Sequence, residues 1–270
     1  MRSAVAGADP AALREAGPAP RAALERVHPA KYLDFLKEFC ARGGGALNEP
    51  DLLVGPPSWD AALHSAGAAL EAVRHACAGQ GNAFAAVRPP GHHALAATPM
   101  GFCLLANAVI AAREAQALGR ERVLIVDWDV HHGNGTQALV ERDPGIRFIS
   151  LHQWPLYPGT GAASERGVGN VWNLPRPPRL PPDHYVGDLL AAVAEALTGW
   201  KPGLILISAG YDSMRGDPLG GFTLEAEDYA RIVAELRSRR PDAPIVGLLE
   251  GGYAPDRLAE GVLATLKALV

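Results

Sequence analysis

The stretch VLIVDWDVHHGNGTQ, residues 123–137, decides the fold. It opens with four apolar residues, which indicates a strand of a parallel sheet, because such strands are covered on both faces and lose polar alternation. Asp127, Asp129 and His131 follow at a spacing of two, so on an extended backbone their side chains share one face. Asp and neutral His are zinc ligands, whereas burying two carboxylates without a cation costs several kcal/mol each. The stretch therefore predicts a metal site at a strand end; the alternative is a strand end capped by solvated acids.

Segments of strand character alternate with segments of helical period along most of the chain. The expected strands are residues 83–87, 123–128, 146–151, 171–174, 204–208 and 245–249. This alternation predicts one α/β domain with a parallel sheet flanked by helices on both faces. We expect the domain to span residues 29–270, after a poorly defined lead-in at 1–28. A loop is expected around Pro50, Asp51, Pro56 and Pro57.

Composition excludes several classes of protein. A net charge of −4 gives no basis for nucleic acid as a direct partner. No apolar run approaches the roughly 20 residues that span a bilayer, and the N-terminus lacks a signal-peptide pattern, so we expect a soluble cytoplasmic protein without membrane contact. Cys40, Cys77 and Cys103 form no CxxC pair, which favours a reducing compartment with the thiols as small apolar residues. The oligomeric state is left open.

Polar and aromatic residues collect after five of the expected strands, where ligands bind in open α/β sheets. These residues are His92, His93, Asp129, His131, Tyr157, Asp212 and Tyr253. Delivery of so many such groups to one edge of a sheet is better explained by a functional site than by chance.

Asp129, His131 and Asp212 can supply three ligands and leave a fourth position for water, which is the pattern of catalytic zinc. Because two carboxylates cancel the charge of the metal, bound water is acidified less than at an all-histidine site, and a general base is needed. The pair His92–His93 can provide that base, and Tyr253 can place its hydroxyl on a developing oxyanion. These residue types together predict hydrolytic chemistry.

Six segments in this order resemble the zinc-dependent histone deacetylase superfamily, the class II branch and the bacterial deacetylase-like and acetylpolyamine amidohydrolases fitting best. They are RPPGHHA, GFCLLAN, VDWDVHHGNG, SLHQWPLYPGTG, SAGYDSMRGDP and LEGGY. The resemblance runs from about His28 to the C-terminus and implies the arginase/deacetylase fold, with a parallel sheet of about eight strands. Members usually begin with an extra strand and an HPER-like segment, and neither is found before Pro29, so one edge of the sheet is open to question.

The resemblance also implies a role for each matching position. The zinc ligands would be Asp129, His131 and Asp212, with ferrous iron as an alternative metal. The catalytic residues would be His92 with its partner Asp127, His93 as proton shuttle with its partner Asn134, and Tyr253 on the acyl carbonyl. A structural potassium ion would be bound by Asp127, Ser150 and backbone oxygens of Asp129, His131 and Leu151. The substrate residues would be Gly101, Phe102 and Tyr157 along a tunnel, with Asp51 at its rim.

These assignments predict a zinc amidohydrolase that removes an acetyl or short acyl group from an alkyl amine, such as acetyl-lysine or an acetylpolyamine. One alternative is a binuclear ureohydrolase of related fold, for which Asp217 is the only spare acid near Asp212. The other is a catalytically silent module that binds metal or acyl-lysine. The presence of the histidine pair and Tyr253 gives no reason to prefer that module.

Overall fold

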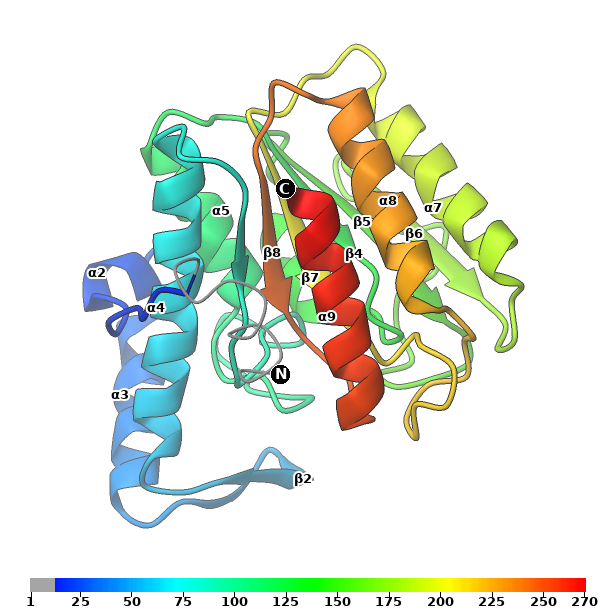
Figure 1. The fold of residues 1–270 in the computed structure, drawn as a ribbon. Helices are drawn as coiled ribbons and strands as arrows, with labels where there is room; N and C mark the ends of the chain where they lie inside the picture. The colour runs from blue at the N-terminus through cyan, green and yellow to red at the C-terminus, as the bar shows by residue number, and fades with distance from the viewer. Residues whose placement is uncertain (1–12) are drawn as a thin grey trace.

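The computed structural model describes residues 13–270, so residues 1–12 of the predicted lead-in lie outside the described part (Figure 1). Six parallel strands form one sheet in the order β3-β8-β7-β4-β5-β6. Their bounds are β3 Ala83–Ala85, β4 Val123–Asp127, β5 Ile146–Gln153, β6 Val171–Arg176, β7 Leu204–Ala209 and β8 Ile245–Leu249. The α/β class predicted from the sequence is confirmed.

The predicted number of about eight parallel strands is too high for the described residues. The two further strands, β1 Gly45–Leu47 and β2 Glu49–Val54, form a separate antiparallel hairpin. The prediction of a loop around Pro50 and Asp51 is therefore wrong, since both lie in β2. Pro lacks the backbone donor that a central strand needs, but it is tolerated in an exposed two-stranded hairpin.

Helices cover both faces of the sheet, as predicted. Their bounds are α2 Arg21–Leu24, α3 Ala30–Ala41, α4 Ser58–Cys77, α5 Asn107–Ala117, α6 Asn134–Val140, α7 Pro182–Leu197, α8 Ala226–Arg239 and α9 Pro255–Leu269. Figure 1 shows α4 and α5 on one side of the sheet and α7, α8 and α9 on the other. One apolar core fills each side, and a third lies under α3 and the hairpin. No helix in residues 13–270 is long and apolar enough to cross a membrane.

Strand β4 lies at the centre of the sheet, and all five of its residues are buried. Parallel pairing places Asp127 beside Ser150 of β5 and Ser208 of β7. Strand β7 in turn lies between β4 and β8. The loops that follow β4, β7 and β8 are therefore neighbours at one edge of the sheet, although they are far apart in the sequence.

His28 joins the segment before α3 to the loop between β3 and α5. Its Nδ1 donates to the carbonyl of Ala96 at 2.9 Å, and its Nε2 accepts from the N–H of Ala106 at 3.0 Å. The side chain is buried, and burial lowers the pKa of His28 from its ordinary value. The imidazole is therefore neutral in the folded protein.

We expect acid to destabilise the fold through His28. A lowered folded-state pKa gives stability that is present above the unfolded value of 6.5 and is lost as the pH falls toward the folded value. One such group changes the free energy of unfolding by at most about 1.4 kcal/mol per pH unit. Urea titrations at pH 7.5 and 5.5 should show a smaller loss for His28→Gln than for the wild type. The exposed His64→Gln is the control, and identical pH dependence of wild type and His28→Gln would contradict this account.

Candidate metal centre

Three buried side chains meet where β4 and β7 end. The Nδ1 atom of His131 lies 3.0 Å from Oδ1 of Asp129 and 3.3 Å from Oδ2 of Asp212. One ligand atom of each residue lies within 4.8 Å of the others. Asp129 and His131 alternate along the segment after β4, and Asp212 comes from the loop after the neighbouring β7. The structure thus brings the three predicted metal ligands together.

The donor set fits a divalent cation. Oδ1 of Asp212 accepts the N–H of Val130, but the buried Oδ2 makes no hydrogen bond among the described residues. Nδ1 of His131 faces both carboxylates, 3.0 Å from Oδ1 of Asp129 and 3.3 Å from Oδ2 of Asp212, which is the arrangement of three ligand atoms around one cation. A buried carboxylate oxygen without a donor is costly, and Zn²⁺ takes carboxylate and imidazole ligands of this kind.

The backbone beside the ligands is fitted closely to them. The N–H of Gly251 donates to Oδ2 of Asp129 at 2.8 Å. A Cβ at Gly251 would lie 2.1 Å from Oδ2 of Asp212 and 2.7 Å from Oδ2 of Asp129, so only glycine fits. Burial, reinforced by the charge of Asp129, raises the pKa of Asp212 to about 7. Against the effect of burial, the two carboxylates raise the pKa of His131 to about 10. The carboxylates therefore favour positive charge between them.

The histidine pair lies beside this group, and its two rings have different partners. Nδ1 of His92 is 3.0 Å from Oδ2 of Asp127, and Nδ1 of His93 is 2.7 Å from Oδ1 of Asn134. The ring centroids are 4.0 Å apart. Because the Asn134 amide nitrogen bonds elsewhere, its oxygen faces His93, which puts the proton on Nδ1 and leaves Nε2 as an acceptor.

The pKa values of the two imidazoles move in opposite directions. Burial favours the neutral form of His92, but the carboxylates of Asp129 and Asp127 outweigh burial and raise its pKa. Burial and the charge of His92 lower the pKa of His93. His92 is thus suited to remain a cation, and His93 is suited to accept a proton.

Tyr253 follows β8, and its ring packs against that of Phe102. Burial and the charges of Asp129 and Asp212 raise its pKa above the usual range, so the phenol keeps its proton. Its backbone N–H donates to Oδ2 of Asp217 at 2.7 Å. Asp217, the acid considered for a second metal, is thus engaged with backbone; in residues 13–270, no second group of three potential ligands is found.

The predicted tunnel residues lie next to the histidine pair. Gly101 and Phe102 both have positive φ, 55° and 64°, and that conformation is strained for phenylalanine. A Cβ at Gly101 would lie 2.2 Å from Cδ2 of His93, so glycine lets this wall approach the imidazole. The Phe102 ring is 6.1 Å from that of Tyr253, and the Tyr157 ring is 5.1 Å from that of His93. The structure therefore places both predicted wall residues beside the predicted catalytic groups.

Glu49 links the two walls and was missed by the sequence analysis. Its Oε2 accepts the N–H of Gly101 at 2.8 Å, and its Oε1 accepts the hydroxyl of Tyr157 at 2.7 Å. One carboxylate of β2 thus joins the loop before α5 to the loop after β5. Nothing in the sequence pattern pointed to it, because the hairpin itself was not predicted.

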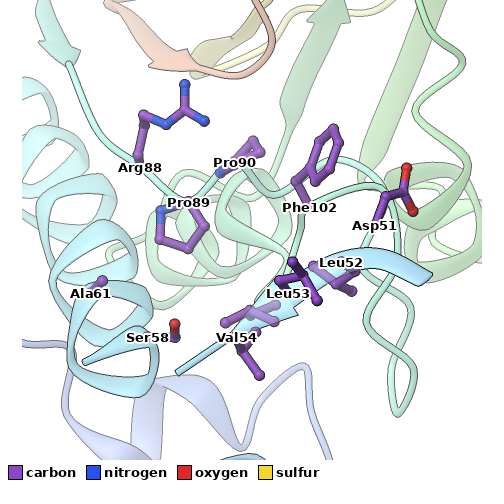
Figure 2. Close-up of a pocket in the computed structure, with 11 residues that line it drawn as sticks. Asp51, Leu52, Leu53, Val54, Ser58, Ala61, Arg88, Pro89, Pro90 and Phe102 are labelled. Carbon is purple, nitrogen blue, oxygen red and sulfur yellow. The ribbon is translucent and has the colours of Figure 1, made fainter. Parts of the chain in front are cut away.

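Asp51, the predicted rim residue, is exposed on β2 (Figure 2). It borders a cavity of about 300 Å³ whose walls also include Leu52, Pro89 and Phe102. Figure 2 shows Phe102 above β2, between Pro90 and Asp51, with the guanidinium of Arg88 directed away from β2. Asp51 therefore lies beside one tunnel wall, and its contact with substrate stays a prediction.

Two of the predicted potassium ligands, Asp127 and Ser150, lie side by side. Strand pairing sets Ser150 beside Asp127, and Oδ1 of Asp127 accepts the N–H of Asp129 at 3.1 Å. Ser150 forms a hydrogen bond with Nδ1 of the buried His152 at 3.0 Å. These contacts leave the potassium site, including the oxygens of His131 and Leu151, as a prediction.

Known proteins resemble this chain in sequence and in fold. Residues 3–269 match the histone deacetylase domain. The chain is 46% identical over 247 residues to an uncharacterized Synechocystis protein, covering 91% of this chain and 80% of that protein. It is 40% identical over 252 residues to a histone deacetylase-like amidohydrolase of Pseudomonas aeruginosa, covering 90% of this chain and 66% of that protein. The crystal structure of an acetylpolyamine aminohydrolase from Burkholderia pseudomallei matches with a TM-score of 0.90 and 28% identity, covering 99% of this chain and 88% of that chain.

The fold and these relatives define a class of hydrolases, the deacetylases and amidohydrolases. The chain belongs to the histone deacetylase family, as the six sequence segments indicated.

Proposed function

We propose that the protein is a zinc-dependent amidohydrolase that removes an acetyl or short acyl group from an alkyl amine, such as acetyl-lysine or an acetylpolyamine. The observation that carries this proposal is the position of His93, whose Nδ1 is bonded to Asn134 and whose ring lies 5.9 Å from that of His131, in a buried Asp–His–Asp group with an unpartnered carboxylate oxygen. The names of two relatives, an amidohydrolase and an acetylpolyamine aminohydrolase, support the same chemistry.

Asp129, His131 and Asp212 would hold the metal, which when bound supplies a Lewis acid for the amide carbonyl and the attacking water. His93 takes the proton of that water at Nε2 and then returns it to the leaving amine. His92, held as a cation by Asp127, and the hydroxyl of Tyr253 stabilise the negative charge that develops on the carbonyl oxygen. The protein thus places one general base, His93, and two hydrogen-bond donors, His92 and Tyr253, around the carbonyl group of the amide.

The tunnel residues orient the substrate. Phe102 and Tyr157 are spaced by Glu49, and an alkyl chain between two aromatic rings buries apolar surface while its polar end stays outside. Asp51, exposed at the rim, would accept a hydrogen bond from the part of the substrate that remains in solvent. A potassium ion at Asp127 and Ser150 would stabilise the strand end that carries the ligands.

Metal removal tests the proposal. We expect acetate release from an acetyl-lysine peptide and from N-acetylputrescine to fall at least about a hundredfold after chelation, and to return with one equivalent of Zn²⁺ or Fe²⁺. Undiminished activity in protein shown to be metal-free would overturn the mechanism. A requirement for two equivalents would favour the binuclear alternative, and metal binding without hydrolysis of any acyl amide would favour the silent module.

A further inference from the structure

A buried carboxylate outside the predicted site lies between the end of β8 and the histidine loop. Glu250 is 3% exposed. Its Oε2 accepts two successive backbone N–H groups, those of Gly91 at 2.6 Å and His92 at 3.1 Å. Its Oε1 lies 3.1 Å from the hydroxyl of Ser208, which donates to it, and its own backbone N–H donates to Ala209 at 3.1 Å. One side chain thus fastens the start of the histidine pair to the two neighbouring strands β7 and β8.

The same short segment holds the other parts of the site. Directly after Glu250, Gly251 donates its N–H to Asp129, and Tyr253 donates its N–H to Asp217. The segment 250–253 therefore contacts the histidine loop and a predicted metal ligand, and it carries the predicted oxyanion donor. The distance between these groups depends on how Glu250 holds the loop.

The loop has little freedom to adjust if this contact is lost. A Cβ at Gly91 would lie 2.5 Å from the backbone nitrogen of Asn107, so the backbone is already packed tightly against the start of α5. Loss of the carboxylate would leave two buried N–H groups without an acceptor, which is unfavourable because each would keep its desolvation cost without a hydrogen bond. Because the packing at Gly91 blocks an easy rearrangement, these groups regain an acceptor only if the backbone of the histidine loop is displaced from its present position.

We propose that Glu250 is a positioning residue that fixes the His92–His93 backbone relative to the metal ligands and Tyr253. The inference rests on the proposed function, because its catalytic consequence is the alignment of His93 with the attacking water. A displacement of about 1 Å in such a group lowers turnover about a hundredfold. The positioning depends on the length of the Glu250 side chain and on its hydrogen bonds, and not on its charge.

Two substitutions separate the effect of the length of the Glu250 side chain from the effect of its charge. In Glu250→Gln the amide oxygen can accept both backbone N–H groups while the amide nitrogen donates to Ser208, so the geometry is kept and the charge is removed. In Glu250→Asp the charge is kept, but the carboxylate is drawn back by about 1.5 Å, the length of one C–C bond. We expect Glu250→Asp to lose about 10- to 100-fold in kcat with KM within twofold, and Glu250→Gln to retain most of kcat.

Two further readouts exclude a merely structural role. Zn²⁺ affinity, measured by competition with a chelator, should be equal in wild type, Glu250→Gln and Glu250→Asp. Amide hydrogen exchange at Gly91 and His92 should be faster in Glu250→Asp and unchanged in Glu250→Gln. Should Glu250→Asp not fold, Ser208→Ala removes one contact of the carboxylate, and a several-fold loss of kcat is expected.

The opposite ranking, with Glu250→Gln worse than Glu250→Asp, would assign the residue an electrostatic role and overturn the proposal. Equal kcat in all variants would do the same, as would a fall in Zn²⁺ affinity that parallels the fall in kcat. If the wild type hydrolyses no acyl amide, the proposed function fails while the exchange rates still test whether Glu250 positions the loop. The two ideas can therefore fail separately.

Discussion

Replacing Asp212 by Asn is expected to lower Zn²⁺ affinity, and with it turnover at limiting metal, between about a hundredfold and several thousandfold. The substitution removes one of two buried carboxylates that favour positive charge between them, and in the metal-bound protein the loss of one charge partner of a buried cation costs about 3–5 kcal/mol. The oxygen lost is the one that has no hydrogen-bond donor among the described residues. An amide in its place is a weaker ligand for a divalent cation.

The same variant should separate metal binding from folding. Without metal, Asp212→Asn should be at least as stable as the wild type, because the substitution removes a charge that burial and repulsion from Asp129 disfavour, the two causes that raise the pKa of Asp212 to about 7. Zn²⁺ at a hundred times its Kd should stabilise the wild type by about 2.7 kcal/mol and the variant by much less. Thermal unfolding with and without Zn²⁺ measures both effects.

Asp217→Asn is the matched control for metal binding. Asp217 lies in the same loop as Asp212, but its carboxylate accepts the N–H groups of Leu219 and Tyr253. Its Zn²⁺-dependent shift in melting temperature should equal that of the wild type. A full shift in Asp212→Asn would show that Asp212 is not a ligand.

The fold and the metal ligands could be predicted because their signals are local. Six apolar runs in the sequence correspond to the six parallel strands. The spacing of Asp129 and His131 predicted that their side chains share one face of an extended backbone; β4 ends at Asp127 and residues 129–131 form a bend, but the two side chains still meet. The number eight came from the family resemblance and not from these runs. The hairpin was missed because its strands are short and one contains Pro50, which favours a loop when no neighbour is known.

Glu49 and Glu250 could not be predicted because their partners are distant in the sequence. Glu49 bonds residues 52 and 108 positions away, and Glu250 bonds backbone groups 158 and 159 positions away. A backbone N–H is present at every residue except proline, so such contacts leave no sequence pattern. Closeness in the sequence was also a poor guide to the role of Asp217. It is near Asp212 in the chain, but its carboxylate accepts the backbone N–H of Tyr253.

Substitution of Tyr253 by Phe should lower kcat by about a hundred- to a thousandfold, the cost of removing one oxyanion donor elsewhere. The variant keeps the ring that packs 6.1 Å from Phe102 and removes only the hydroxyl. That hydroxyl is protonated across the working pH range, because burial and two neighbouring carboxylates raise its pKa. It can therefore donate a hydrogen bond without first gaining a proton.

The separate effects of Tyr253→Phe on kcat and on KM show whether the hydroxyl acts in the transition state. A donor that meets the oxygen only as charge develops lowers kcat and kcat/KM together, with little change in KM. Zn²⁺ affinity should be unchanged, since Tyr253 is not among the predicted ligands. A rise in KM at constant kcat would instead assign Tyr253 to substrate binding, and unchanged kinetics would leave His92 as the donor.

Since the Tyr253 backbone is held by Asp217, Asp217→Ala should reproduce part of the loss in kcat by letting an intact hydroxyl move away from the oxygen.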